Sequence, residues 1–138
     1  MAMAGASDTR LPSRPTVLAV LDDSERSALL KMSLCGHGWE VIRAHSCEQA
    51  RARALEVPGG RLDVLLTDLV LGDGSAFGLI RSVPVTPLVA IVLTWGNQHG
   101  IRERIVASGF DAHLVRPVTG DEIDLALREK LAAKLRAA

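Results

Sequence analysis

Residues 62–68 read LDVLLTD, an apolar run that ends on an acidic residue. A strand inside a parallel sheet is apolar along its whole length, because helices cover both faces of the sheet. The run therefore predicts a buried strand that carries Asp68 at its carboxyl end. Moving outward from it in both directions, four more segments are interpreted as strands: TVLAVL (16–21), WEVIRA (39–44), LVAIVLT (88–94) and AHLV (112–115).

Helix signals lie between these five strands. Ser24 and Ser46 are placed to cap two helices, and Gln49 follows Ser46 at the spacing of a capping box. Thr119 and Glu122 repeat that spacing before a final helix. The apolar face of this helix consists of Ile123, Leu127, Leu131 and Leu135. Because parallel strands need crossover connections, five strands alternating with five helices predict an α/β fold with a doubly wound parallel sheet.

The length of 138 residues is that of one ordinary domain, which we place at residues 16–136. Residues 1–15 are interpreted as a disordered leader or as part of a linker. Sixteen basic and sixteen acidic side chains cancel, so the overall charge favours neither nucleic acid nor a membrane as a partner. The chain has two cysteines without a CxxC pair and no apolar run typical of a signal peptide or a membrane span. These features favour a cytoplasmic protein.

Polar residues at the ends of the predicted strands are expected to meet at one edge of the sheet. In doubly wound sheets, ligands bind beyond the carboxyl ends of the strands. The residues at these positions are Asp22, Asp23, Asp68, Thr94 and Arg116. Carboxylates that lie close together repel one another unless a cation offsets their charge, and Mg²⁺ prefers such oxygen ligands. The pattern predicts a magnesium site in which one of these carboxylates attacks a phosphorus atom and becomes an aspartyl phosphate.

Four motifs occur in order at the predicted strand ends: VLDDSE (20–25), LLTDLVLGDG (65–74), IVLT (91–94) and HLVRP (113–117). Over residues 16–131 the chain resembles the receiver domain of bacterial response regulators, related to the chemotaxis regulator. The resemblance implies the flavodoxin-like receiver fold, with strand order 2-1-3-4-5. It also implies that a histidine kinase or a histidine phosphotransfer protein donates a phosphoryl group to the chain in two-component signalling.

The same resemblance assigns roles to the matching positions. Asp68 matches the phosphoacceptor. Asp22 and Asp23 match the acidic pair that binds Mg²⁺ together with Asp68, and Val70 matches the residue whose backbone carbonyl is a further metal ligand. Thr94 matches the switch hydroxyl that bonds the phosphoryl group.

Five residues depart from the family pattern, and two of them lie in the loop after the third strand, where Gly72 replaces a frequent Pro and Ala76 a common Gly. Arg116 replaces the usual lysine, and because arginine is a planar fork rather than a compact charge, we predict a weakened or rewired switch. Trp95 stands where a small residue is usual, and it is expected to restrict either the phosphodonor or the attacking water. His113 takes the place of the aromatic switch ring. These departures concern switching rather than the fold.

A phosphoacceptor receiver domain is therefore the predicted function, and the chain is interpreted as a signalling domain rather than an enzyme that turns over substrate. The alternative is a pseudo-receiver, an interaction or dimerisation module whose phosphorylation control is lost at Arg116 and Trp95. An aspartyl phosphatase is disfavoured, because it would need an Asp-x-Asp pair where this chain has Asp22-Asp23. The face formed by the fourth helix, the fifth strand and the fifth helix is the expected homodimer surface by the resemblance alone.

Each candidate residue also has a plain structural interpretation. Asp22 and Asp23 alone would more often form a helix-capping turn. Asp68 alone could begin a turn, and Thr94 could be an ordinary strand residue. Cys35 and Cys47 are interpreted as small buried apolar groups.

Overall fold

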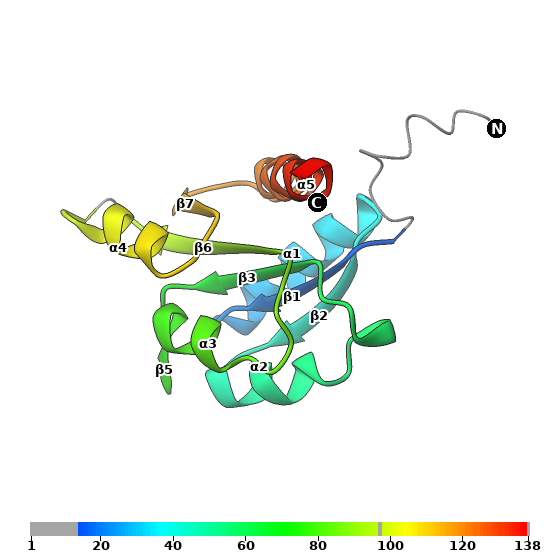
Figure 1. Ribbon diagram of the computed structural model, residues 1–138, viewed down its shortest axis with the longest axis horizontal. Helices are drawn as coiled ribbons and strands as arrows, with labels where there is room; N and C mark the ends of the chain where they lie inside the picture. The colour runs from blue at the N-terminus through cyan, green and yellow to red at the C-terminus, as the bar shows by residue number, and fades with distance from the viewer. Residues whose placement is uncertain (1–13, 97, 138) are drawn as a thin grey trace.

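A parallel sheet of five strands forms the centre of the structure, a computed structural model that describes residues 14–96 and 98–137 (Figure 1). The sheet strands are β1 (Thr16–Val20), β2 (Glu40–Ala44), β3 (Val64–Asp68), β6 (Val89–Trp95) and β7 (Ala112–Arg116). They lie in the order β2-β1-β3-β6-β7, which is the predicted 2-1-3-4-5 order when the five sheet strands are counted. The expected leader, residues 1–15, lies outside the described residues except for positions 14 and 15.

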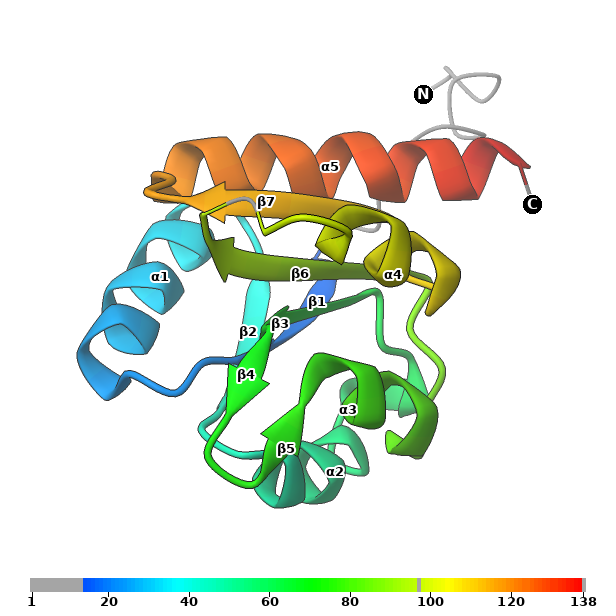
Figure 2. The same ribbon diagram turned by 90° about the vertical axis from the view of Figure 1, so that its left-hand side faces the viewer.

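Five α-helices in the described part of the chain cover both faces of the sheet (Figure 2). Helices α1 (Ser24–Gly36) and α5 (Gly120–Ala137) pack on one face, where apolar side chains of both helices meet those of the strands. Helices α2 (Cys47–Ala54), α3 (Ala76–Ser82) and α4 (Ile101–Ala107) pack on the other. The doubly wound fold is confirmed. None of the helices in the described residues is both long and apolar enough to cross a membrane.

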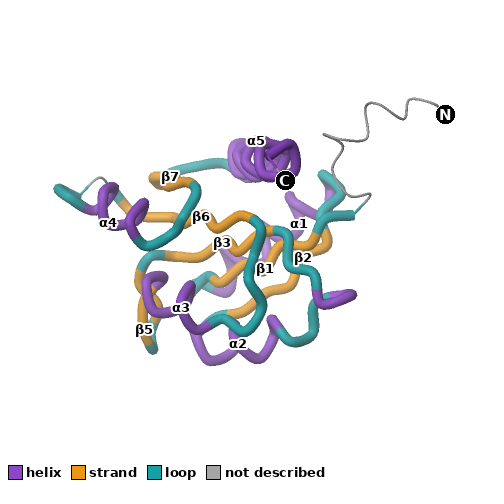
Figure 3. Tube along the Cα trace, in the orientation of Figure 1, coloured by secondary structure: helices purple, strands orange, loops and turns teal. Residues whose placement is uncertain are grey.

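Two small strands, β4 (Val70–Leu71) and β5 (Gly74–Ser75), form an antiparallel hairpin directly after β3. The Gly-rich sequence LGDG at residues 71–74 predicts a loop here, because strands of two residues are too short to show a periodic pattern. Figure 3 shows β5 apart from the main sheet and beside α3. A 3₁₀ turn, η2 (Pro58–Gly60), follows α2.

The tip of this hairpin caps α2. The Asp73 carboxylate accepts the backbone N–H groups of Cys47 at 2.7 Å and Glu48 at 3.0 Å. These two hydrogen bonds lower the pKa of Asp73, because they stabilise its charged form. The loop that follows Asp68 is therefore tied to the start of a neighbouring helix.

The observed helix caps agree with the sequence in two of three places. Ser46 accepts the N–H of Gln49 at 3.0 Å, and Thr119 and Glu122 exchange the two hydrogen bonds of a capping box. The prediction for Ser24 was wrong: Asp23 is the N-cap of α1, and Ser24 is its first helical residue. A carboxylate is preferred there because it interacts favourably with the helix dipole.

The two cysteines differ in exposure. Cys47 is buried as expected, and burial is the largest cause of the raised pKa of its thiol. Cys35 is exposed, so the prediction of a buried thiol was wrong at this position. It lies near the end of α1, outside the stripe of α1 that faces the sheet at Leu30 and Leu34.

Trp39 ties the start of β2 to α5. Its side chain is fully buried, and its indole N–H donates to Asp124 at 2.8 Å. The Arg128 Nε also donates to that carboxylate, at 2.9 Å. A buried indole needs such a partner, since an unpaired polar group in the core is costly.

Helix α5 begins in close contact with α1. A Cβ atom added at Gly120 would lie 2.7 Å from the Cβ of Ser33, which is closer than real side chains approach. Only glycine fits here without a shift of one helix. This contact places the β7–α5 connection, and with it Arg116, next to the first helix.

We expect Gly120→Ala to lower the free energy of unfolding by about 1–3 kcal/mol, because the new methyl group overlaps the Ser33 side chain. Urea unfolding followed by circular dichroism measures the change. Adding Ser33→Gly, which alone costs about 0.5–1 kcal/mol in a helix, should recover part of the loss. Two independent, additive costs in the double variant would contradict the close contact.

Candidate functional site

The carboxyl ends of the central strands border a cavity of about 560 Å³. All five residues predicted at the strand ends line it, and so does Val70 at the start of β4. The lining residues used below are Asp22, Asp23, Arg26, Asp68, Thr94, Trp95 and Arg116. The fold thus brings together residues that the sequence separates by up to 94 positions, from Asp22 to Arg116. His113 does not line the cavity, but its Nε2 lies 2.6 Å from the Thr94 Oγ1.

Asp68 is held between a backbone group and a cation. Its Oδ2 accepts the N–H of Asp22 at 3.0 Å, and its Oδ1 accepts Nη2 of Arg116 at 3.0 Å. The carboxylate is 17% exposed and the Arg116 side chain 10% exposed, so water screens this pair weakly. The strand register accounts for the approach, because Asp68 ends β3 beside Leu93 of β6, and Arg116 ends β7 beside Trp95.

Arg116 does not use all of the hydrogen-bond donors of its guanidinium group. Its Nε is buried and has no hydrogen-bond partner among the described residues. Such an orphaned donor costs free energy, and a guanidinium is shaped to bind two oxygens of one anion. The side chain thus presents an unused N–H beside a carboxylate that it already neutralises.

Asp23 has both of the roles that the sequence left open. It lines the cavity, and it also caps α1 by accepting the N–H of Arg26 at 3.0 Å. That backbone hydrogen bond is the largest cause of its lowered pKa, and the charge of the same arginine contributes. The Arg26 Nη2 lies 3.1 Å from the second carboxylate oxygen. Asp22 follows β1 at the exposed side of the cavity.

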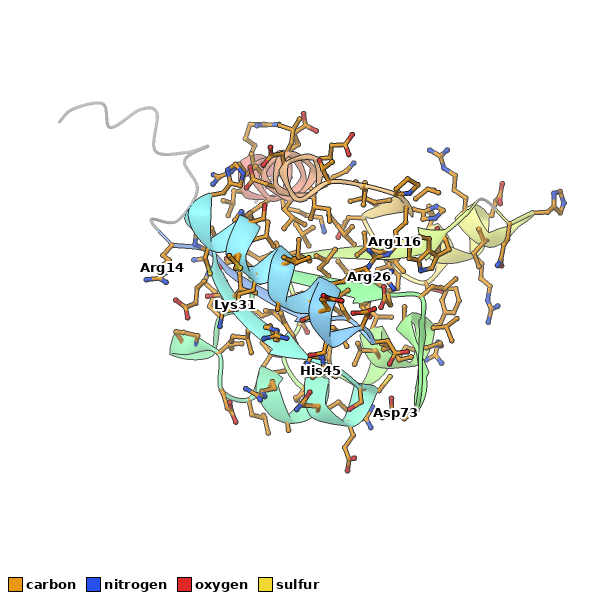
Figure 4. All side chains as sticks on the ribbon, turned by 180° about the vertical axis from the view of Figure 1, so that it is seen from behind. Arg14, Arg26, Lys31, His45, Asp73 and Arg116 are labelled. Carbon is orange, nitrogen blue, oxygen red and sulfur yellow. The ribbon has the colours of Figure 1, made fainter. Side chains whose placement is uncertain are left out.

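The sequence analysis missed Arg26 as a residue of this site. Its Cζ lies 4.8 Å from the ring centroid of Trp95, and the Cζ of Arg116 lies 5.3 Å from the same centroid. Figure 4 shows Arg26 and Arg116 close to each other. One signal was available: Arg26 follows Asp23 by three residues at a helix start, a spacing at which opposite charges meet.

Thr94 and His113 form a short hydrogen-bonded pair across neighbouring strands. The Thr94 Oγ1 lies 2.6 Å from Nε2 of His113, and it also donates to the Gly96 carbonyl at 3.2 Å. Burial is the main cause that lowers the pKa of His113, and the positive charge of Arg102 adds to it. A neutral imidazole can accept the threonine hydrogen, whereas an imidazolium can only donate.

The donor set around the cavity fits Mg²⁺ by its chemistry. Three carboxylates line one space together with Val70, and carboxylate oxygens are among the ligands this ion prefers. As arranged, however, no three acidic, histidine or cysteine side chains of the described residues converge closely enough to hold a metal ion. Arginines occupy the carboxylates of Asp23 and Asp68 instead.

Comparisons with known proteins agree with this fold. No family model matches the chain. A receiver domain protein, described as CheY-like, from Methanospirillum hungatei superposes with a TM-score of 0.78 at 22% identity, covering 91% of this chain and 100% of that one. A putative response regulator from Chloroflexus aurantiacus gives a TM-score of 0.74 at 26% identity, covering 86% and 98%.

Curated relatives are longer than this chain. The transcriptional regulatory protein TrcR of Mycobacterium tuberculosis is 29% identical over 114 residues, which cover 81% of this chain and 43% of TrcR. The transcriptional regulatory protein AruR of Pseudomonas aeruginosa is 32% identical over 113 residues, covering 79% and 46%. The chain therefore spans less than half the length of either relative.

We expect His113 to make the stability of the domain depend on pH. Because its pKa is lowered from the ordinary 6.5 in the folded chain, the unfolded chain binds the proton more readily. The stabilising contribution is complete above pH 6.5 and is lost as the pH falls toward the lowered pKa. His113→Phe should reduce the drop in the urea midpoint between pH 7.5 and pH 5.5. An equal drop in both chains would show that His113 does not contribute.

Proposed function

We propose that this chain, which has the fold of response-regulator receiver domains, accepts a phosphoryl group on Asp68 from a histidine kinase or a histidine phosphotransfer protein. The observation that carries the proposal is the pairing of Asp68 with Arg116, whose buried Nε has no partner. A nucleophilic carboxylate next to an unsatisfied guanidinium donor suits the transfer of an anionic group.

The transfer forms one bond and breaks another. An oxygen of the Asp68 carboxylate attacks phosphorus as the phosphorus–nitrogen bond of a phosphohistidine breaks, and the imidazole leaves with the electron pair and takes up a proton. The product is an acyl phosphate on Asp68. The free Nε of Arg116 can donate to a phosphoryl oxygen, and it would then gain the partner that it lacks.

Thr94 is placed to hold the same group. Its hydroxyl lines the cavity with Asp68, and it has a single hydrogen to donate. Donation to a phosphoryl oxygen would take that hydrogen from its present acceptor and rotate the hydroxyl, whose oxygen also lies 2.6 Å from Nε2 of His113. Loading of Asp68 would in this way reach β7 through His113, which we propose as the switch.

The carboxylates of Asp22, Asp23 and Asp68 and the carbonyl of Val70 would hold Mg²⁺. The bound ion would offset the negative charge that gathers on the phosphoryl oxygens during transfer. Asp68 keeps its orientation through the N–H of Asp22, and Arg116 stays nearby through its packing against Trp95.

We also propose a dimer surface and a cellular location for the domain. The face of α4, β7 and α5 is proposed as a homodimer surface, and it exposes Val106 and Leu125. A cytoplasmic site follows from the proposed phosphodonors. A pseudo-receiver is the second candidate, and the Arg26–Asp23 ion pair favours it, because it occupies a carboxylate that would bind Mg²⁺.

Beryllofluoride binding tests the proposed acceptor, since this ion mimics an acyl phosphate and needs no kinase. With Mg²⁺ present, we expect backbone amide NMR shifts around Asp68, Thr94 and Arg116 in the wild-type chain. Asp68→Asn should abolish them, whereas Asp121→Asn, a neutralisation on the exposed start of α5, should leave them unchanged.

The pattern of shifts separates the two candidate functions. Shifts that extend to His113 would support a working switch through Thr94. An unresponsive wild-type chain would contradict the phosphoacceptor and favour the pseudo-receiver. Shifts that persist in Asp68→Asn would place the acceptor at another residue.

A further inference from the structure

Two arginines already balance the acidic residues of the cavity. Arg116 pairs with Asp68 at 3.0 Å, and Arg26 pairs with Asp23 at 3.1 Å. A divalent cation attracted by these carboxylates would therefore meet positive charge that is part of the chain. To use both Asp23 and Asp68, it has to weaken or displace at least one of these ion pairs.

The two pairs differ in how easily they open. The Arg116 side chain is 10% exposed, and β7 holds its backbone in the sheet. The Arg26 side chain is 41% exposed and starts from the first turn of α1, at the rim of the cavity. Water can solvate the Arg26 guanidinium as it leaves, whereas the Arg116 guanidinium would lose a largely buried partner. Arg26 is thus the cation that is displaced more readily.

Trp95 holds Arg26 in place over the acids. The ring is 62% exposed, which is unusual for so large an apolar side chain unless it has a partner or a task. Its partners here are two arginines, because the guanidinium carbons of Arg26 and Arg116 lie 4.8 Å and 5.3 Å from the centroid of the ring. A cation over an aromatic face is stabilised by the ring, most strongly by tryptophan. Trp95 therefore opposes the departure of Arg26 from Asp23.

Release of Arg26 would leave the helix cap intact. One Asp23 oxygen accepts the backbone N–H of Arg26, and the other faces its guanidinium. The second oxygen can be freed by a side-chain movement alone. Neither α1 nor the Asp22–Asp23 turn has to shift.

We propose that Arg26, seated on Trp95, is a built-in counter-ion that competes with a divalent cation for Asp23 and so lowers the affinity of the cavity for that cation. The inference rests on the proposed function only in sharing its metal site. Arg26 is then a positioning residue, and it determines the Mg²⁺ concentration at which the site fills.

Titration with MgCl₂ in a buffer of low ionic strength tests this role in the full chain. We expect Arg26→Gln to bind Mg²⁺ about threefold to tenfold more tightly than the wild type, because one ion pair and one cation–π contact no longer compete. Arg53→Gln removes the same charge from an exposed position on α2, and it should behave like the wild type. The difference should shrink at high salt, which screens exposed pairs.

Tryptophan fluorescence provides the readout. The chain has two tryptophans, and Trp39 is fully buried against Asp124, so a response to Mg²⁺ is expected from Trp95. Trp95→Phe identifies the source by abolishing the response. Isothermal titration calorimetry gives the same dissociation constant without the fluorophore. Arg26→Lys, which keeps the charge but loses the planar contact with the ring, should lie between the wild type and Arg26→Gln.

The outcomes distinguish this inference from the proposed function. Tighter Mg²⁺ binding by Arg26→Gln supports the counter-ion, even if beryllofluoride does not bind and the phosphoacceptor fails. Equal or weaker binding by Arg26→Gln overturns the counter-ion, even if beryllofluoride binds to the wild type. An absence of Mg²⁺ binding in both chains overturns it as well.

Discussion

The repulsion between carboxylates at the ends of parallel strands is the constraint on which this site depends. Parallel strands end at one edge, so Asp68 on β3 and the Asp22–Asp23 pair after β1 have to share it. The structure balances that charge with Arg116 from β7 and Arg26 from α1. Asp68 and Asp23 each also accept a backbone N–H, which fixes the orientation of these two carboxylates. The charges of Asp23 and Asp68 are therefore balanced by groups of the chain itself.

Trp95 contacts both of the arginines that balance the acidic residues. As the register partner of Arg116 it lies at the end of β6, and its ring also receives the guanidinium of Arg26 from α1. A small residue at this position would leave both arginines without that support. Trp95 and Arg116, two departures from the family pattern, therefore form one unit with Arg26 of α1.

A second chain of contacts leads away from the acidic site. Thr94 faces the cavity and shares its hydroxyl with Gly96 and with His113 of β7. A hydroxyl donates one hydrogen, so an acceptor that appears in the cavity competes with the partner that accepts this hydrogen. These contacts connect the cavity to the α4–β7–α5 face through the His113 imidazole, which can titrate, whereas a purely apolar ring could not.

The sequence by itself determined the sheet, its alternation with helices and the edge at which the acidic residues gather. Apolar runs, capping residues and Asp68 at the end of LDVLLTD are local signals, whereas the order of the strands came from the resemblance. Neither revealed the β4–β5 hairpin or the exposure of Cys35, and the sequence left Asp23 open between a helix cap and a residue of the site. The Arg26–Asp23 pair follows from a spacing of three residues at a helix start, whereas the partner of Asp68 was decided only by the tertiary structure. Whether Arg26 meets Trp95 depends on how α1 lies relative to β6, because contacts between side chains of different elements are set by packing and not by spacing along the chain.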